Sequence, residues 1–182
     1  EGSSIVDFAT LNMAIVVIAE KPSVANDIAK VLGVSGKKET HWESPDIIVT
    51  WAVGHLLELK TPEEYDDELK DWRKSVDRLP FIPSDFELKP IGGRGSNKKQ
   101  LTAIKKLIKD KSCTEVVNAC DAAREGELIF RRIVEFAKIN TLQSRMWLQS
   151  MTPDSILKAW ENREAASNYS DLRDAAVCRA EA

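Results

Sequence analysis

The chain has 182 residues, of which 43% are hydrophobic and 30% are charged. This length and composition suffice for a globular domain with its own core and exclude a disordered chain. The longest apolar runs fall far short of the roughly 20 residues that cross a membrane, and the net charge of -3 does not by itself indicate a nucleic-acid binder. The three cysteines are too widely spaced for a zinc site or a disulfide framework, which favours a cytoplasmic location.

The two ends of the chain are expected to lie outside the main domain. Residues 1–12 have neither the basic start nor the cleavage site of a signal peptide, and we expect them to be a leader. The last helix is expected to be capped by Ser170 or Asp171 and meets no stop signal. Residues 166–182 are therefore expected to begin a helix of a following domain, which leaves residues 13–165 for the main fold.

Residues 14–19 are a continuous apolar run with several β-branched side chains, typical of a strand buried on both faces of a parallel sheet. Glu20 and Lys21 follow this run, and Pro22 then opens a helix that ends at Gly33. An exposed glutamate and lysine can simply be a solvated pair of little energetic value. They would also lie at the carboxyl edge of the sheet, where α/β proteins build their sites.

Residues 47–51 predict a second strand, followed by Gly54 and His55. His55 can be a general acid, a phosphate ligand or a structural residue of a tight turn. Residues 61–95 form an irregular excursion whose prolines and aromatic residues favour an ordered segment over a linker. Its glycine-rich end, residues 92–97, lacks the lysine of a P-loop and is interpreted as a connector.

A helix capped by Asn97 is predicted next, with leucine and isoleucine residues on its inner face and lysines on its outer face. Lys98 and Lys99 belong to this basic surface. The surface is either a solvated helix face or a contact for DNA.

An acidic turn follows the strand predicted over residues 115–120. It carries Asp121, Glu125 and Glu127 around Arg124. Acidic residues in the first turn of a helix stabilise its dipole and require no ligand. A cluster of carboxylates also recruits a cation, and Mg²⁺ is the expected ion because it binds through few carboxylates and keeps water and phosphate as its other ligands.

A strand over residues 145–148 and a helix over residues 153–160, capped by Thr152, complete the predicted pattern. The alternation indicates an α/β fold, a Rossmann-like compact parallel sheet of about four strands flanked by helices. Both charged turns then meet at one sheet edge. There Asp121 and Glu125 can hold a divalent ion, Lys21 can neutralise a phosphate and Glu20 can protonate a leaving oxygen, which are the parts of a phosphoryl-transfer site.

These motifs resemble the Toprim domain of type IA DNA topoisomerases, in particular the topoisomerase III branch. The resemblance covers residues 13–182 and is carried by five segments. These are Glu20-Lys21-Pro22-Ser23, residues 50–59, the acidic turn at 121–127, residues 148–156 and residues 174–182.

The resemblance implies a four-stranded parallel sheet, Mg²⁺, and the cleavage and religation of single-stranded DNA by a tyrosine. By motif position, Glu20 would be the catalytic acid or base, Lys21 the phosphate-stabilising cation, and Asp121 and Glu125 the metal ligands. His55, Arg124, Lys98 and Lys99 are the residues expected to contact DNA. The remaining domains of the same polypeptide would be partners.

Two departures from the family pattern affect these expectations. The middle acid of the Asp-x-Asp-x-Glu pattern is replaced by Ala123, which removes one potential metal ligand. The family's nucleophilic tyrosine is expected in a later domain, because neither Tyr65 nor Tyr169 stands in its motif. This chain alone is therefore expected not to relax DNA.

Two other functions fit the same residues. A Toprim nuclease or primase would use a similar acid cluster for phosphoryl transfer. A non-catalytic module would bind DNA or a partner through the lysine-rich helix, with a strong dependence on salt.

Overall fold

The structure of this chain is a computed structural model, which describes residues 13–71, 73, 76–92 and 95–182. The predicted leader lies outside the described residues. The strands are β1 (Ala14–Ala19), β2 (Gly36–Lys37), β3 (His41–Glu43), β4 (Ile47–Trp51), β5 (Leu57–Leu59), β6 (Leu88–Pro90), β7 (Cys113–Ala119), β8 (Leu142–Arg145) and β9 (Glu164–Ala165). The α-helices are α1 (Pro22–Val31), α3 (Gly95–Ile108), α4 (Arg124–Ala137), α5 (Pro153–Glu161) and α6 (Ser170–Glu181).

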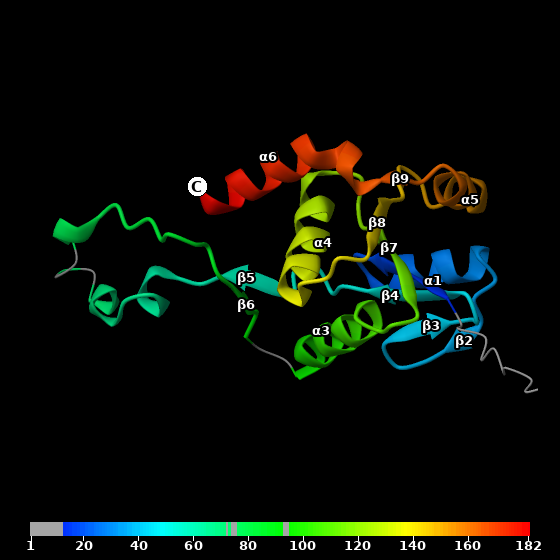
Figure 1. Ribbon diagram of the computed structural model, residues 1–182, viewed down its shortest axis with the longest axis horizontal. Helices are drawn as coiled ribbons and strands as arrows, with labels where there is room; N and C mark the ends of the chain where they lie inside the picture. The colour runs from blue at the N-terminus through cyan, green and yellow to red at the C-terminus, as the bar shows by residue number, and fades with distance from the viewer. Residues whose placement is uncertain (1–12, 72, 74–75, 93–94) are drawn as a thin grey trace, which may run out of the picture.

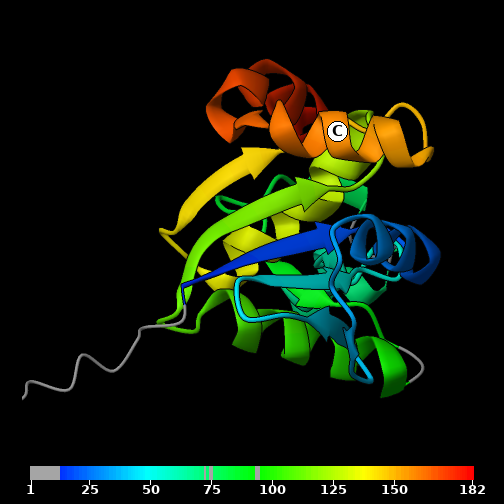
Figure 2. The same cartoon turned by 90° about the vertical axis from the view of Figure 1, so that its right-hand side faces the viewer.

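The main sheet has seven strands in the order β2-β3-β4-β1-β7-β8-β9. Its four central strands, β4, β1, β7 and β8, run parallel, and Figure 2 shows their arrowheads pointing the same way. This confirms the predicted parallel sheet of about four strands. The antiparallel strands β2, β3 and β9 were not predicted, because two or three residues are too few to show a pattern of alternation.

Helices cover both faces of this sheet, as expected for an α/β fold. On one face α3 and α4 pack against alternate strand residues such as Val16 and Val116. On the other face α1 and α5 pack against their neighbours Val17 and Val117. Successive residues of β1 and β7 are thus buried on opposite faces, which explains the continuous apolar sequence of β1 and the adjacent valines 116 and 117 of β7. The last helix, α6, packs on α4 (Figure 1).

Two element boundaries and one helix cap differ from the prediction. The strand expected at 145–148 is found at Leu142–Arg145, paired with residues 115–118 of β7, and its polar sequence had concealed it. Helix α3 begins at Gly95, so Asn97 lies inside its first turn and does not cap it. Helix α6 begins at Ser170 but has no side-chain cap. The cap of α5 is confirmed, because the Thr152 side chain accepts a hydrogen bond from the Ser155 amide.

The excursion predicted at 61–95 is closed at its base by an antiparallel pair, β5 and β6, and extends away from the sheet (Figure 1). It contains three short 3₁₀-helices, Pro62–Glu64, Asp67–Lys70 and Val76–Arg78. Its described residues hold one another through contacts such as Tyr65 on Phe81, with ring centroids 5.8 Å apart. Residues 93–94 of the predicted glycine-rich connector lie outside the described residues. No helix in the described part of the chain is both long and apolar enough to span a membrane.

Candidate active site at the carboxyl edge of the sheet

The candidate site lies where β1 and β7 end side by side. β1 pairs with β4 on one side and with β7 on the other. The chain adds β4 on the first side and later adds β7 and β8 on the second, so the direction of strand addition reverses between β1 and β7. Ala19 and Ala119, the last residues of the two strands, are register partners. Glu20 and Asp121 follow them almost directly. In open α/β sheets this switch point is where ligands bind.

Lys21 joins the two acidic residues of this edge. Its Nζ lies 3.5 Å from Glu20 Oε1 and 4.0 Å from Asp121 Oδ2. The Glu20 side chain is only 10% exposed, whereas those of Lys21 and Asp121 are 56% and 55% exposed. Within the described chain, Glu20 Oε2 is buried without a hydrogen-bond partner. The sequence prediction that the two charged turns meet at one edge is therefore confirmed in position.

The loop after β4 brings His55 to the same edge. The Gly54 amide donates to the Glu20 carbonyl at 3.3 Å, and Gly54 has a φ of 70°, which favours glycine. The His55 Nε2 is hydrogen-bonded to a carboxylate oxygen of Glu125. The other ring nitrogen, Nδ1, is buried and has no partner within the described residues. Of the predicted site residues, His55 and Glu125 thus form a second pair beside Glu20, Lys21 and Asp121.

The backbone of the acidic turn is packed directly on the first turn of α4. The Ala123 amide donates to the Asp121 carbonyl at 2.8 Å, and the Glu127 amide donates to the Ala123 carbonyl at 3.2 Å. Gly126 faces the Asp121 backbone so closely that a Cβ at position 126 would lie 2.2 Å from the Asp121 carbonyl oxygen. Only glycine fits there. Ala123 occupies the N-cap position of α4 and provides no side-chain cap.

Glu127 is buried, whereas the other two carboxylates of the turn are exposed to solvent. Its residue is 4% exposed, whereas the Glu125 side chain is 64% exposed. The Asn118 side-chain amide donates to Glu127 Oε2 at 3.0 Å, and Arg145 Nε lies 3.6 Å from the same oxygen. Burial raises the pKa of Glu127, although Arg145 opposes this shift. Glu127 is therefore part of the interior, and Asp121 and Glu125 are the accessible acids.

Arg145 is a residue of this region that the sequence analysis missed. It is 1% exposed and donates hydrogen bonds to the carbonyls of Asn118, Cys120 and Asp121 at 3.3, 2.9 and 2.6 Å. Its guanidinium also lies over the Trp147 ring, 5.3 Å from the centroid. A lone arginine next to the apolar run 146–148 was the available signal, because a buried arginine needs several acceptors.

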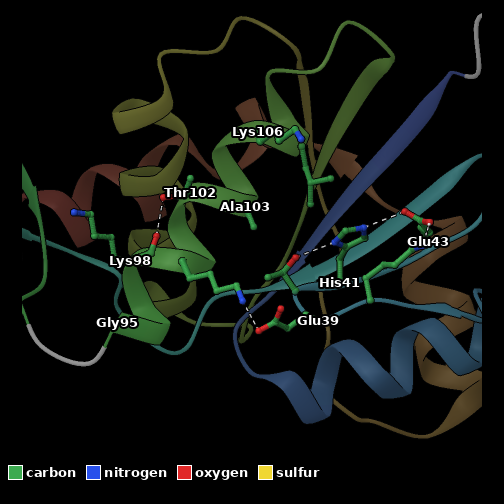
Figure 3. A pocket seen from close by; sticks show the side chains of 12 residues that line it. Glu39, His41, Glu43, Gly95, Lys98, Thr102, Ala103 and Lys106 are labelled. Atoms are coloured by element: carbon green, nitrogen blue, oxygen red, sulfur yellow. Dashed lines mark hydrogen bonds and ion pairs between the residues drawn. The ribbon is translucent and has the colours of Figure 1, made fainter.

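The basic residues predicted to contact DNA are divided between two places. Arg124 is exposed at the start of α4, next to the acidic turn. Lys98 and Lys99 line a groove of about 860 Å³ between α3 and the β2–β3 hairpin, and Figure 3 shows this groove. In the groove, Lys99 pairs with Glu39. The described contacts of Lys99 are thus within this groove and not with the carboxylates of the sheet edge.

The residues at the edge fit a magnesium ion. The available donors are carboxylate oxygens, and one of them, Glu20 Oε2, is buried with its hydrogen-bonding capacity unused within the described chain. The described residues contain no cluster of three or more His, Cys, Asp or Glu side chains arranged around one point. Mg²⁺ does not need such a cage, because one or two carboxylates, waters and substrate phosphate oxygens complete its octahedron.

Comparison with known proteins agrees with the fold. The family model described as "Toprim domain" matches residues 15–151. A putative DNA topoisomerase 3 and a DNA topoisomerase 3 from two Staphylococcus aureus strains, bovine RF122 / ET3-1 and MRSA252, are each 39% identical over 170 residues. These alignments cover 93% of this chain but only 23% of each relative, so the chain spans about a quarter of their length.

A solved structure shows the same fold. Full-length topoisomerase I from Thermotoga maritima superposes with a TM-score of 0.50 and 22% sequence identity, over 82% of this chain and 21% of that chain. The sequence match and this superposition lead to one assignment. The chain belongs to the Toprim domain family.

Proposed function

We propose that this chain is the Toprim part of a type IA DNA topoisomerase of the topoisomerase III branch, which cleaves and religates single-stranded DNA. The observation that carries the proposal is the grouping of Glu20, Lys21 and Asp121 at the switch point of the sheet, where Lys21 Nζ lies 3.5 Å from Glu20 and 4.0 Å from Asp121. The names of the Staphylococcus aureus relatives support the same class of reaction. The tyrosine nucleophile and the rest of the DNA path belong to further domains of the same polypeptide in this proposal.

Glu20 and Lys21 have complementary roles in the proposed reaction. The Lys21 side chain is more than half exposed, and its Nζ stabilises the negative charge that develops on the scissile phosphate. Glu20 has one oxygen next to Lys21 and one without a hydrogen-bond partner among the described residues, so its carboxyl can hold or release the proton of the leaving oxygen. Both side chains start from the turn after β1, which fixes their separation.

Asp121 and Glu125 would hold Mg²⁺ at this edge. When bound, the ion would neutralise charge on the phosphate oxygens and help to orient the DNA strand. Ala123 supplies no ligand between them, so the acidic turn would contribute two carboxylates. His55 would share Glu125 with the ion, because its Nε2 already contacts that carboxylate.

Single-stranded DNA is the proposed substrate, and its backbone would contact Arg124 and His55 near the scissile phosphate. Lys98 and Lys99 would provide a more distant contact from helix α3. Phosphate contacts of this kind position the strand and do not read its sequence.

The metal site is tested by titrating the purified chain with Mg²⁺ and Mn²⁺, following calorimetric heat and the Mn²⁺ electron paramagnetic resonance signal. Asp121→Asn should lower the affinity at least 10-fold, because it removes one of two carboxylate ligands. Asp110→Asn is the matched control, since Asp110 is an acid at the opposite edge of the sheet whose carboxylate accepts from Ser112. Equal affinity of the Asp121 variant and the wild-type chain would refute the proposed ligand.

Two assays separate the topoisomerase from the alternatives. The chain alone should neither relax supercoiled plasmid nor cut single-stranded DNA. Irreversible Mg²⁺-dependent cutting without a protein–DNA linkage would favour the nuclease. Salt-dependent DNA binding that is unaffected by EDTA and by Asp121→Ala would favour the non-catalytic module.

A further inference from the structure

The backbone of the acidic turn is held by a buried side chain from the neighbouring strand, and these contacts indicate a role for that side chain. Arg145 ends β8, next to β7, and its guanidinium points beneath the turn that follows β7. One terminal nitrogen donates to the Cys120 carbonyl at 2.9 Å and the other to the Asp121 carbonyl at 2.6 Å. Two consecutive peptide groups are thus held by one planar group.

The surroundings of Arg145 keep this group in one orientation. Its Nε faces the buried Glu127 carboxylate at 3.6 Å, and its plane lies against Trp147. Trp147 in turn stacks on Tyr169, with centroids 5.3 Å apart and an interplanar angle of 17°. An arginine that is 1% exposed, charged and clamped on three sides has little freedom to move. The two carbonyls that it binds share that restriction.

We propose that Arg145 is the positioning residue of the site, fixing the backbone from which the Asp121 carboxylate reaches the edge. It contacts no substrate or metal in this proposal and acts through the Cys120–Asp121 peptide. The inference deepens the proposed function and rests on it only where metal binding is concerned. The restriction of the acidic turn by Arg145 does not depend on the proposed function.

Arg163 provides a matched control. It is also an arginine that binds a carboxylate, Glu115, at 3.0 and 3.1 Å, donates to a backbone carbonyl, that of Trp160, at 2.9 Å, and lies over a tryptophan ring. These contacts lie at the amino-terminal end of β7. Arg163→Lys therefore loses the same kinds of interaction far from the acidic turn.

The first measurement uses the metal-free chain. Arg145→Lys should speed hydrogen exchange of the Ala123 amide, which donates to the Asp121 carbonyl, by about 10-fold or more while the amides of β1 and β4 stay protected. Arg163→Lys should leave the Ala123 amide unchanged. Arg145→Met should have a larger effect than Arg145→Lys. If it fails to fold, the lysine variant still decides the question.

The second measurement is Mn²⁺ affinity. A residue that orients a metal ligand without binding the metal typically contributes about 10- to 100-fold to metal affinity. Arg145→Lys should therefore weaken Mn²⁺ binding by about 10-fold, and Arg163→Lys should leave it unchanged. Unchanged exchange at Ala123 in a folded Arg145→Lys chain would overturn the inference. A wild-type chain whose Asp121 does not respond to the metal would instead refute the proposed function and leave the exchange result intact.

Discussion

Gly126 supports a quantitative prediction, because a single methyl group at this position must displace the acidic turn. The added Cβ would lie 2.2 Å from the Asp121 carbonyl oxygen and 2.7 Å from its amide nitrogen. Ordinary contacts of a Cβ begin near 3.4 Å, so the Asp121 backbone must retreat by about 1 Å. That movement disrupts the hydrogen bonds that the Asp121 carbonyl accepts from Ala123 and Arg145, at 2.8 and 2.6 Å.

The expected cost follows from these two bonds. Losing a neutral hydrogen bond and one from a charged donor costs about 3 kcal/mol together, and the better helix propensity of alanine returns about 1 kcal/mol. Gly126→Ala should therefore lower the free energy of unfolding by about 2 kcal/mol, which shifts the melting temperature of a domain this size by about 4–8 °C. Urea unfolding followed by circular dichroism measures this change.

Gly95→Ala is the control for Gly126→Ala. Gly95 is the first residue of α3, and a Cβ there would meet nothing within 4 Å. This variant should be as stable as the wild-type chain or up to about 1 kcal/mol more stable. If Gly126→Ala is also as stable as the wild type, the close approach of α4 to the acidic turn is wrong.

Two further predictions concern Ala123 and Glu115. Ala123→Ser should cap α4 and raise the free energy of unfolding by about 1 kcal/mol without changing Mg²⁺ affinity. Ala123→Asp should cap the helix and also tighten Mg²⁺ binding. Urea unfolding measures the stability and calorimetry measures the affinity. Burial raises the pKa of Glu115, but hydrogen bonds from Arg163 and Ser144 outweigh it and hold that pKa below its usual value of 4.5. The ionised Glu115 should therefore stabilise the folded chain above pH 4.5, and this contribution to the free energy of unfolding should be lost as the pH falls below 4.5. Urea unfolding of the wild type and of Glu115→Gln between about pH 5 and 3 tests this. An equal loss of stability in both chains would contradict it.

The sequence predicted the parallel core and its charged edge because both depend on local patterns. Strand β1 is buried on both faces, so its apolar run is continuous, and β7 carries a shorter β-branched run; a charged turn follows each strand. Pro22 and Thr152 mark helix starts through backbone chemistry that needs no distant partner. Glu20 and Asp121 could therefore be placed at one edge before their neighbours were known.

Other features could not be predicted because they depend on contacts between distant segments. Nothing local distinguishes the buried Glu127 from the exposed Glu125 two residues earlier; the difference is set by Asn118 and Arg145 below one of them. The pairing of Lys99 with Glu39 likewise depends on a hairpin whose strands have only two or three residues. The division into a domain at 13–165 and a following helix at 166–182 stays a prediction.

The site combines a fixed backbone with exposed side chains, and this combination suits the proposed binding of a cation and a phosphate. The Asp121 backbone is held by Arg145, by Ala123 and by the absence of a side chain at Gly126. The carboxylates of Asp121 and Glu125 are nevertheless 55% and 64% exposed. Their rotamers can adjust when a cation and a phosphate arrive together, while the origin of each side chain stays constant. Mutations beneath the turn should therefore impair metal binding without touching a ligand, and mutations of the ligands should leave the fold intact.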